Sequence, residues 1–262
     1  MHFTLNKRIL RERLLAMVSK ANPSPIFIFG NQKSGTSAVA GLLAEATALP
    51  LIADFAGAQM PFIGDLIAGR TRVETFVSRN AWAFSAPLVK DPGLSFAAPA
   101  LLQHFPESRG IFLLRNPWQN IRSILERLDL RGDAKEIVPG ARRINRTWQG
   151  ILTGTDLGLP PAPYVDILAM RWLRAAQIAE QLSGRVILMR YEDFNAGKRQ
   201  TIEQLARDLE LPVKNDISQK LDHQFQPRGR GTDPRQFFGQ NYARIATICG
   251  AKAAQLGYEG RS

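Results

Sequence analysis

Cysteine, histidine and long apolar runs are the features this sequence has least of. Among 262 residues it contains one cysteine, Cys249, and three histidines. A single cysteine excludes an internal disulfide and a cysteine-rich metal site. No apolar stretch approaches the roughly 18 residues that a membrane-spanning helix needs, and the first residues lack the continuous apolar block of a signal peptide. We therefore expect a cytoplasmic protein that works without a metal.

Acidic residues are scarce relative to basic ones. The chain has 34 Lys and Arg against 23 Asp and Glu, which gives a formal net charge of +11. Such a surplus fits nucleic acid, an anionic membrane surface or a strongly anionic small ligand. The sequence has no recognisable nucleic-acid motif and no interleaving of aromatic and basic residues like that of single-strand binders. We therefore expect no nucleic-acid partner.

Residues 1–22 contain a basic segment with helical periodicity. Within residues 5–19, apolar side chains recur near one helical face, and they are Leu5, Ile9, Leu10, Leu14, Met17 and Val18. Basic side chains cover the rest of the helix, namely Lys7, Arg8, Arg11 and Arg13. The pattern favours a surface helix whose apolar face packs on the core. Peripheral contact with anionic lipid is the alternative.

The stretch 25–45, PIFIFGNQKSGTSAVAGLLAE, organises the rest of the chain. A short run of β-formers ends at Gly30, a small polar loop follows, and an Ala- and Leu-rich helical pattern begins near Ala38. Strand, tight loop and helix together aim backbone N–H groups and a helix N-terminus at an anion. The stretch therefore predicts a P-loop-like phosphate site, to which Lys33 adds a cation.

The remaining pattern alternates strands with helices. Strands are predicted at 26–29, 51–53, 87–90, 110–114 and 185–190, and helices at 95–105, 117–128, 141–152, 164–183, 198–210 and 240–256. This alternation indicates an α/β fold with three layers, a mostly parallel sheet with helices on both faces. We expect one domain over 1–262, in which 129–163 forms an excursion on the substrate side.

The order of residues in the loop separates two kinds of phosphate site. A nucleoside-triphosphate loop places its lysine after the last glycine, whereas here Lys33 precedes Gly35. The segment Lys33-Ser34-Gly35-Thr36-Ser37 instead resembles the loop that binds the 5′-phosphosulfate in sulfotransferases. Their donor is 3′-phosphoadenosine 5′-phosphosulfate (PAPS), and their product is PAP. The resemblance implies that these five residues bind that end of the donor.

Three further segments are similar to sulfotransferase motifs and follow in the family's order. Arg115 at a strand end, with Ser123 eight residues later, matches the pair that contacts the donor's 3′-phosphate. Tyr191, in Arg-Tyr-Glu-Asp-Phe, matches a tyrosine near the adenine. Arg228 and Gly229 match only approximately a loop that closes over the 3′-phosphate. The resemblance thus spans residues 26–235.

The catalytic groups implied by the resemblance are two lysines and a carboxylate. Lys90 stands at a strand end where many family members place a lysine near the transferring group, but Pro92 occupies the place of the histidine base of the cytosolic enzymes. Family branches with proline at this place use a carboxylate as the base. The position of Asp54 in the sequence resembles the position of that carboxylate. Glu45, Glu74 and His223 stay open as alternatives to Asp54.

The resemblance implies a PAPS-dependent sulfotransferase of the bacterial or glycan type rather than the phenol-type cytosolic branch. Such an enzyme would transfer the sulfuryl group to a hydroxyl acceptor, and a carbohydrate or glycolipid is favoured. No sequence motif identifies the acceptor. One alternative is a nucleotide or small-molecule kinase on a related phosphate-loop fold. Another is a non-catalytic protein that binds polyanions or membranes.

Overall fold

The computed structural model describes residues 2–134, 144–221 and 233–258, with side chains from residue 7 onward. Within these ranges the chain forms a five-stranded sheet in the order β2-β3-β1-β4-β5, and every neighbouring pair of strands is parallel. The strands are β1 (Ile26–Gly30), β2 (Leu51–Ala53), β3 (Leu88–Lys90), β4 (Gly110–Leu114) and β5 (Val186–Arg190).

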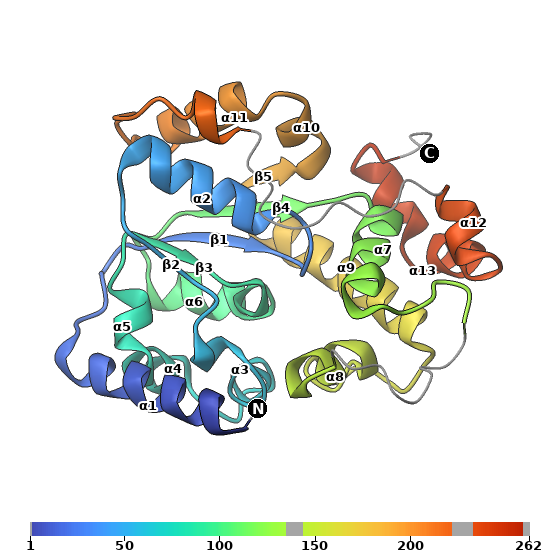
Figure 1. The fold of residues 1–262 in the computed structure, drawn as a ribbon, viewed down its shortest axis with the longest axis horizontal. Helices are drawn as coiled ribbons and strands as arrows, with labels where there is room; N and C mark the ends of the chain where they lie inside the picture. Colours follow the sequence, from blue (N-terminus) through green and yellow to red (C-terminus); the bar gives the residue numbers. More distant parts are fainter. Residues whose placement is uncertain (1, 135–143, 222–232, 259–262) are drawn as a thin grey trace.

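The alternation of side chains along β1 explains why the sheet is covered on both faces. Ile26 and Ile28 pack in one apolar cluster, whereas Phe27 and Phe29 pack in a second cluster on the other face. The first cluster includes residues of α2 (Thr36–Thr47) and α11 (Lys198–Asp208). The second includes residues of α6 (Ala98–His104), α7 (Pro117–Leu128), α9 (Tyr164–Gln181) and α13 (Asn241–Gln255). The three layers are visible in Figure 1, with α2 and α11 on one side of the sheet and α6 and α9 on the other.

Shorter elements fill the connections. Between β2 and β4 they are η1 (Ala56–Ala58), α3 (Phe62–Ile67), α4 (Val73–Arg79), α5 (Ala81–Phe84) and the 3-10 helix η2 (Pro92–Ala97). Later in the chain they are α8 (Arg146–Thr153), α10 (Tyr191–Ala196), η3 (Ser218–Lys220) and α12 (Pro234–Phe238). The backbone N–H of Met60 donates to Thr147 Oγ1 at 3.2 Å, so α8 lies against the segment before α3.

The α/β fold with a parallel sheet and helices on both faces is confirmed, and so are all five predicted strands. The predicted start of α7 is also confirmed, because Asn116 Oδ1 accepts a hydrogen bond from the backbone N–H of Gln119 at 3.2 Å and Pro117 occupies the first turn. The extent of the domain stays a prediction.

The first helix, α1 (His2–Val18), forms as predicted, but four of the six apolar side chains expected on the core face are turned to solvent, while Ile9 is half-buried and the Leu5 side chain lies outside the described residues. The exposed fractions are 60% for Leu10, 58% for Leu14, 82% for Met17 and 83% for Val18. The cause is Glu12, whose Oε2 accepts a hydrogen bond from the buried backbone N–H of Ala56 at 2.8 Å. This contact fixes the rotation of the helix, with Glu12 and Ala16 inward. None of the helices formed by the described residues is long and apolar enough to cross a bilayer.

Candidate functional site

The residues singled out in the sequence gather at one edge of the sheet. Because all five strands are parallel, their carboxyl ends lie at the same edge. The loop 31–35 follows β1, Asp54 follows β2, Lys90 ends β3, Arg115 follows β4 and Tyr191 follows β5. In open α/β sheets this edge is where ligands bind.

The loop after β1 has the backbone geometry of an anion site. Gly35 precedes α2 with a φ of 97°, a left-handed conformation that glycine adopts without strain, and no side-chain hydrogen bond caps this helix. The N–H groups of the first helical turn have no acceptor within the helix. Those of Thr36 and Ser37 therefore suit the oxygens of a phosphate or sulfate group, which the helix dipole also favours.

Side chains from η2 and α7 hold this loop in shape. Asn120 is buried, and its Nδ2 donates to the carbonyl oxygen of Gln32 at 2.8 Å and to Ser34 Oγ at 3.2 Å. Its Oδ1 accepts a hydrogen bond from Asn31 Nδ2 at 2.9 Å. Ser95 Oγ accepts from the Gly30 N–H at 2.7 Å and donates to the Gly30 carbonyl oxygen at 3.0 Å. The loop is thus preorganised, so little ordering is needed when a ligand binds.

Arg115 and Tyr191 lie together beside the loop. The guanidinium carbon of Arg115 stands 4.6 Å from the centre of the Tyr191 ring, and Arg115 Nη1 donates to the Lys33 carbonyl oxygen at 3.2 Å. A Cβ added at Gly35 would come within 2.4 Å of Cδ2 of the same ring. Only glycine therefore lets the loop approach Tyr191 this closely. The structure brings together the loop, Arg115 and Tyr191, as the sequence predicted.

Ser123 lies half-buried on α7, one turn after Asn120. Side chains three or four residues apart on a helix are neighbours, so Ser123 shares the face that meets the loop. Arg127 follows one turn later, and its charge acts on Lys33. Sequence reasoning missed Asn120 and Arg127, although their spacing from Ser123 along one helical face is a signal that could have identified them.

Lys33 is a cation in a basic, partly buried setting. Burial, followed by the positive charges of Arg127 and Arg115, lowers the pKa of Lys33 to about 8. An anion bound between these groups would relieve their mutual repulsion. The electrostatics of this part of the site therefore favour a ligand with negative charge.

Lys90 connects the loop to Asp54. Its Nζ donates to Ser37 Oγ at 2.8 Å and to the two carboxylate oxygens of Asp54 at 2.9 and 3.1 Å. The Lys90 side chain is 3% exposed and that of Asp54 is 59% exposed. Lys90 is thus buried next to the first turn of α2, while the Asp54 carboxylate remains open to an incoming molecule.

Asp91 is a buried carboxyl beside this pair. Burial, followed by the negative charge of Asp54, raises the pKa of Asp91 to about 8. Its Oδ1 accepts a hydrogen bond from the Gly93 N–H at 2.7 Å. This hydrogen bond caps the N-terminus of η2. The buried site therefore favours the uncharged form of Asp91, and the ion pair that the structure shows here is the one between Lys90 and Asp54.

The alternatives to Asp54 lie elsewhere. Glu45 is near the end of α2, at the opposite edge of the sheet, and forms an ion pair with Lys220 at 2.6 Å. Glu74 in α4 is paired with Arg72 at 3.2 Å and also lies near His104, at the end of α6 that leads into β4. Both acids therefore form ion pairs away from Lys90, which favours Asp54, and the identity of the base stays a prediction. His223, Arg228 and Gly229 lie outside the described residues, so their roles stay predictions.

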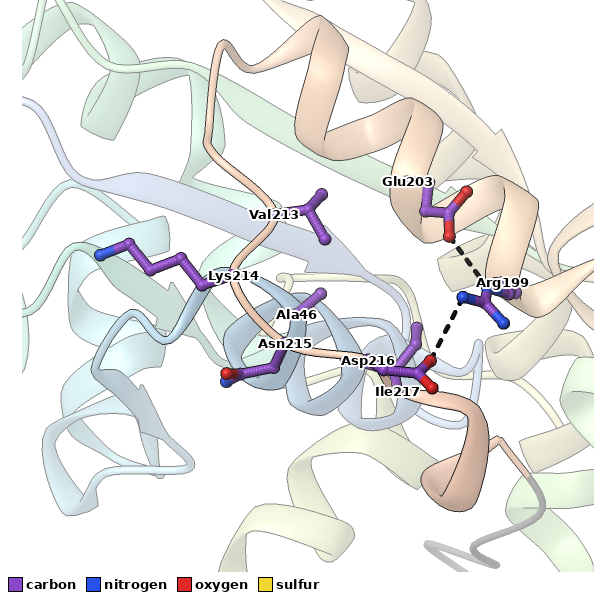
Figure 2. A pocket seen from close by; sticks show the side chains of 8 residues that line it. All are labelled: Ala46, Arg199, Glu203, Val213, Lys214, Asn215, Asp216 and Ile217. Atoms are coloured by element: carbon purple, nitrogen blue, oxygen red, sulfur yellow. Dashed lines mark hydrogen bonds and ion pairs between the residues drawn. The ribbon is translucent and has the colours of Figure 1, made fainter.

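A separate surface hollow of about 230 Å³ lies far from these groups. Figure 2 shows it beside the end of α2 and α11, where Arg199 forms ion pairs with Glu203 and Asp216. It is lined by Ala46, Arg199, Glu203, Val213, Lys214, Asn215, Asp216 and Ile217. Because α2 starts at the carboxyl edge of the sheet and ends at the opposite edge, this hollow is not part of the site.

No protein-family model matches the chain, and no curated protein sequence matches it. Solved structures do resemble it. A sulfotransferase of Mycobacterium avium is 13% identical with a TM-score of 0.58, covering 95% of this chain and 81% of the other. A mouse sulfotransferase complexed with PAP is 10% identical with a TM-score of 0.56, covering 96% of this chain and 93% of the other. The sulfotransferase domain of the curacin biosynthetic pathway is 17% identical with a TM-score of 0.50, covering 92% of this chain and 99% of the other. At such identities the likeness concerns the fold, and this chain has the fold of these sulfotransferases.

Proposed function

We propose that the protein transfers the sulfuryl group of PAPS to a hydroxyl acceptor, releasing PAP and a sulfate ester. The observation that carries this proposal is the contact of Lys90 with Ser37 and Asp54 at the N-terminus of α2, with Lys33 in the loop that leads into this helix. It places two cations and an accessible carboxylate beside a helix terminus that suits an anion. The mouse sulfotransferase that shares the fold is complexed with PAP, which supports the choice of donor.

The donor end of the site would bind both phosphate groups. The N–H groups at the start of α2, with Lys33 and the hydroxyls of Ser34, Thr36 and Ser37, would hold the 5′-phosphosulfate. Arg115 and Ser123 would hold the 3′-phosphate, with Arg127 as a third group on the same side. Tyr191, stacked on Arg115, would border the adenine.

The transfer step assigns one role to each remaining residue. The acceptor oxygen forms a bond to sulfur while the bond between sulfur and the bridging oxygen breaks. Asp54 takes the acceptor's proton, and Lys33 and Lys90 neutralise the negative charge that develops around the transferring group. The proposal further includes a reaction that needs no metal and a carbohydrate or glycolipid as the acceptor. It also includes membership of the glycan-type branch and a cytoplasmic location.

A transfer assay with labelled PAPS tests the proposal. Purified protein is incubated with labelled donor and a panel of carbohydrate, glycolipid and phenol acceptors, and labelled products are separated. We expect label in a sulfate ester of a carbohydrate or glycolipid. Magnesium-dependent phosphate transfer from ATP, with no transfer from PAPS, would instead support the kinase.

Replacing Arg115 with alanine should weaken PAP binding by about ten- to a hundredfold, the usual contribution of a charge-assisted phosphate contact. The variant Arg115→Lys should recover only part of this loss, because lysine cannot bind a phosphate bidentately or stack on Tyr191 in the same way. Calorimetric titration measures both, with Arg70→Ala, which removes a surface arginine paired with Asp65, as the matched control. Unchanged PAP affinity in Arg115→Ala would contradict the role assigned to this residue.

The affinity for PAP should fall as the pH rises through the pKa of Lys33. Below about 8 the ammonium is charged and attracts the donor's phosphate, whereas above this value it becomes neutral. We expect a loss of up to about tenfold between about pH 7 and about pH 9. In Lys33→Arg the guanidinium stays charged over this range, so most of the fall should disappear, and only the smaller effect of Asp91, which also ionises near this pH, should remain. An equally steep fall in that variant would assign the dependence to another group.

A further inference from the structure

The outer face of α1 carries an apolar stripe, which we define as Leu10, Leu14, Met17 and Val18. Six large hydrophobic side chains are exposed in the described part of the chain, and four of them form this stripe. Their spacing along the helix places them on one face. The other two, Leu188 and Val213, lie apart in β5 and in the segment after α11. A contiguous exposed patch of this kind marks an interaction surface, whereas single exposed side chains do not.

The surroundings of the stripe are basic. Lys7, Arg11 and Arg13 are exposed on the same helix, and Lys20 is exposed just beyond its end. Glu12 is the one acidic residue of α1, and it is buried and paired with Arg8 at 2.8 Å. The outward surface of the helix is therefore apolar at its centre and positively charged at its margins.

This orientation is fixed by contacts on the inner side of α1. Glu12 accepts the Ala56 N–H, and beyond the helix the Asn22 N–H donates to the Phe84 carbonyl oxygen at 2.9 Å. The helix packs on η1, α4 and α5, and Figure 1 shows it along the outside of the molecule. Burying the stripe inside the fold would require breaking the buried Glu12 contact, so the stripe is available to an external partner.

We infer that α1 is a docking surface for an anionic lipid bilayer. The stripe would enter the boundary between headgroups and acyl chains, and the basic residues would contact the negatively charged headgroups. A second copy of the chain fits less well, because a symmetric contact through this face would bring Arg11 and Arg13 of both copies together.

The same helix reaches the candidate site. Arg8 donates a hydrogen bond to the carbonyl oxygen of Asp54, whose carboxylate pairs with Lys90. The first half of α1, whose outer face would lie on the bilayer, is therefore next to Asp54. This placement has a consequence for the acceptor, which rests on the proposed function. The hydroxyl that receives the sulfuryl group would belong to a molecule anchored in the lipid bilayer.

Vesicle flotation tests the docking without any donor or acceptor. We expect the protein to float with vesicles that contain phosphatidylserine and to bind vesicles of phosphatidylcholine alone much more weakly. Met17→Glu should reduce binding at least about tenfold, since it places a charge in the apolar boundary, whereas Val213→Glu, the same kind of change at another exposed site, should not. Arg11→Ala should reduce binding about fivefold, and Arg70→Ala should reduce it less.

Two results would overturn the inference. One is absence of binding to phosphatidylserine vesicles by protein that still binds PAP, which would leave the proposed function intact. The other is sedimentation showing a dimer that Met17→Glu converts to a monomer, since the stripe would then be covered by a second copy. Loss of PAP binding with vesicle binding retained would contradict only the proposed function.

Discussion

Replacing Lys33 with alanine should lower the rate of sulfuryl transfer by roughly 100- to 1,000-fold while leaving the fold intact. The side chain is the cation of the loop after β1, and removing one group that stabilises transition-state charge has about this cost. The loss should appear in kcat and in kcat/KM, measured with labelled PAPS and the best acceptor.

The matched control for Lys33→Ala is Lys220→Ala. Lys220 also carries a lysine charge next to α2, but it pairs with Glu45 at the opposite edge of the sheet. Its replacement should leave transfer unchanged. Near-normal turnover in Lys33→Ala, with unchanged thermal stability in both variants, would be incompatible with the proposed mechanism.

Replacing Asp54 with asparagine should lower kcat by about 100- to 10,000-fold, the usual contribution of a general base, and leave PAP affinity nearly unchanged. Asp54 has a φ of 54°, a left-handed conformation that asparagine tolerates well, so the backbone should be preserved. The amide cannot accept the acceptor's proton, and Lys90 loses its ion pair while its hydrogen bond to Ser37 Oγ remains.

Asp65→Asn is the control for this variant, because it neutralises an acid that pairs with Arg70 at the surface. A parallel loss of PAP affinity and kcat in Asp54→Asn would show that the residue supports donor binding through Lys90. Full activity in Asp54→Asn would remove it as the base.

The parts of the fold that follow from local patterns were predictable. The run Ile26–Phe29 has apolar side chains on both faces of the strand, and this is the pattern of a strand buried between two layers of helices. The order of Lys33 and Gly35 alone distinguishes this loop from a nucleoside-triphosphate loop. Because parallel strands share a carboxyl edge, the strand ends also predicted that Arg115 and Tyr191 would meet the loop.

The contacts between residues distant in the sequence were not predictable. Asn120 holds the loop from 86 to 89 positions away, and Lys90 reaches Asp54 across 36 positions. Periodicity places such residues on elements but does not say which polar side chains will meet. The buried ion pair between Arg171 and Asp156 at 2.6 Å was not predicted for the same reason. Arg171 Nη2 also donates a hydrogen bond to Gln32 in the loop.

The orientation of α1 shows a different limit of sequence reasoning. Its apolar residues define one face, and packing that face on the core is the usual arrangement. Here a single acidic residue, Glu12, satisfies a backbone N–H in the interior and turns the apolar face outward. Hydrophobicity alone does not contain that information.

The most direct test of the central claim is a calorimetric comparison of PAP with ADP in the absence of magnesium. The two ligands have the same atoms and differ in where the second phosphate stands, at the 3′ position in PAP and on the 5′-phosphate in ADP. If Arg115 and Ser123 bind a 3′-phosphate while the loop at Lys33–Ser37 binds the 5′ end, PAP should bind at least about tenfold more tightly. Equal binding of the two ligands, or tighter binding of ADP, would contradict the assignment of this site to PAPS.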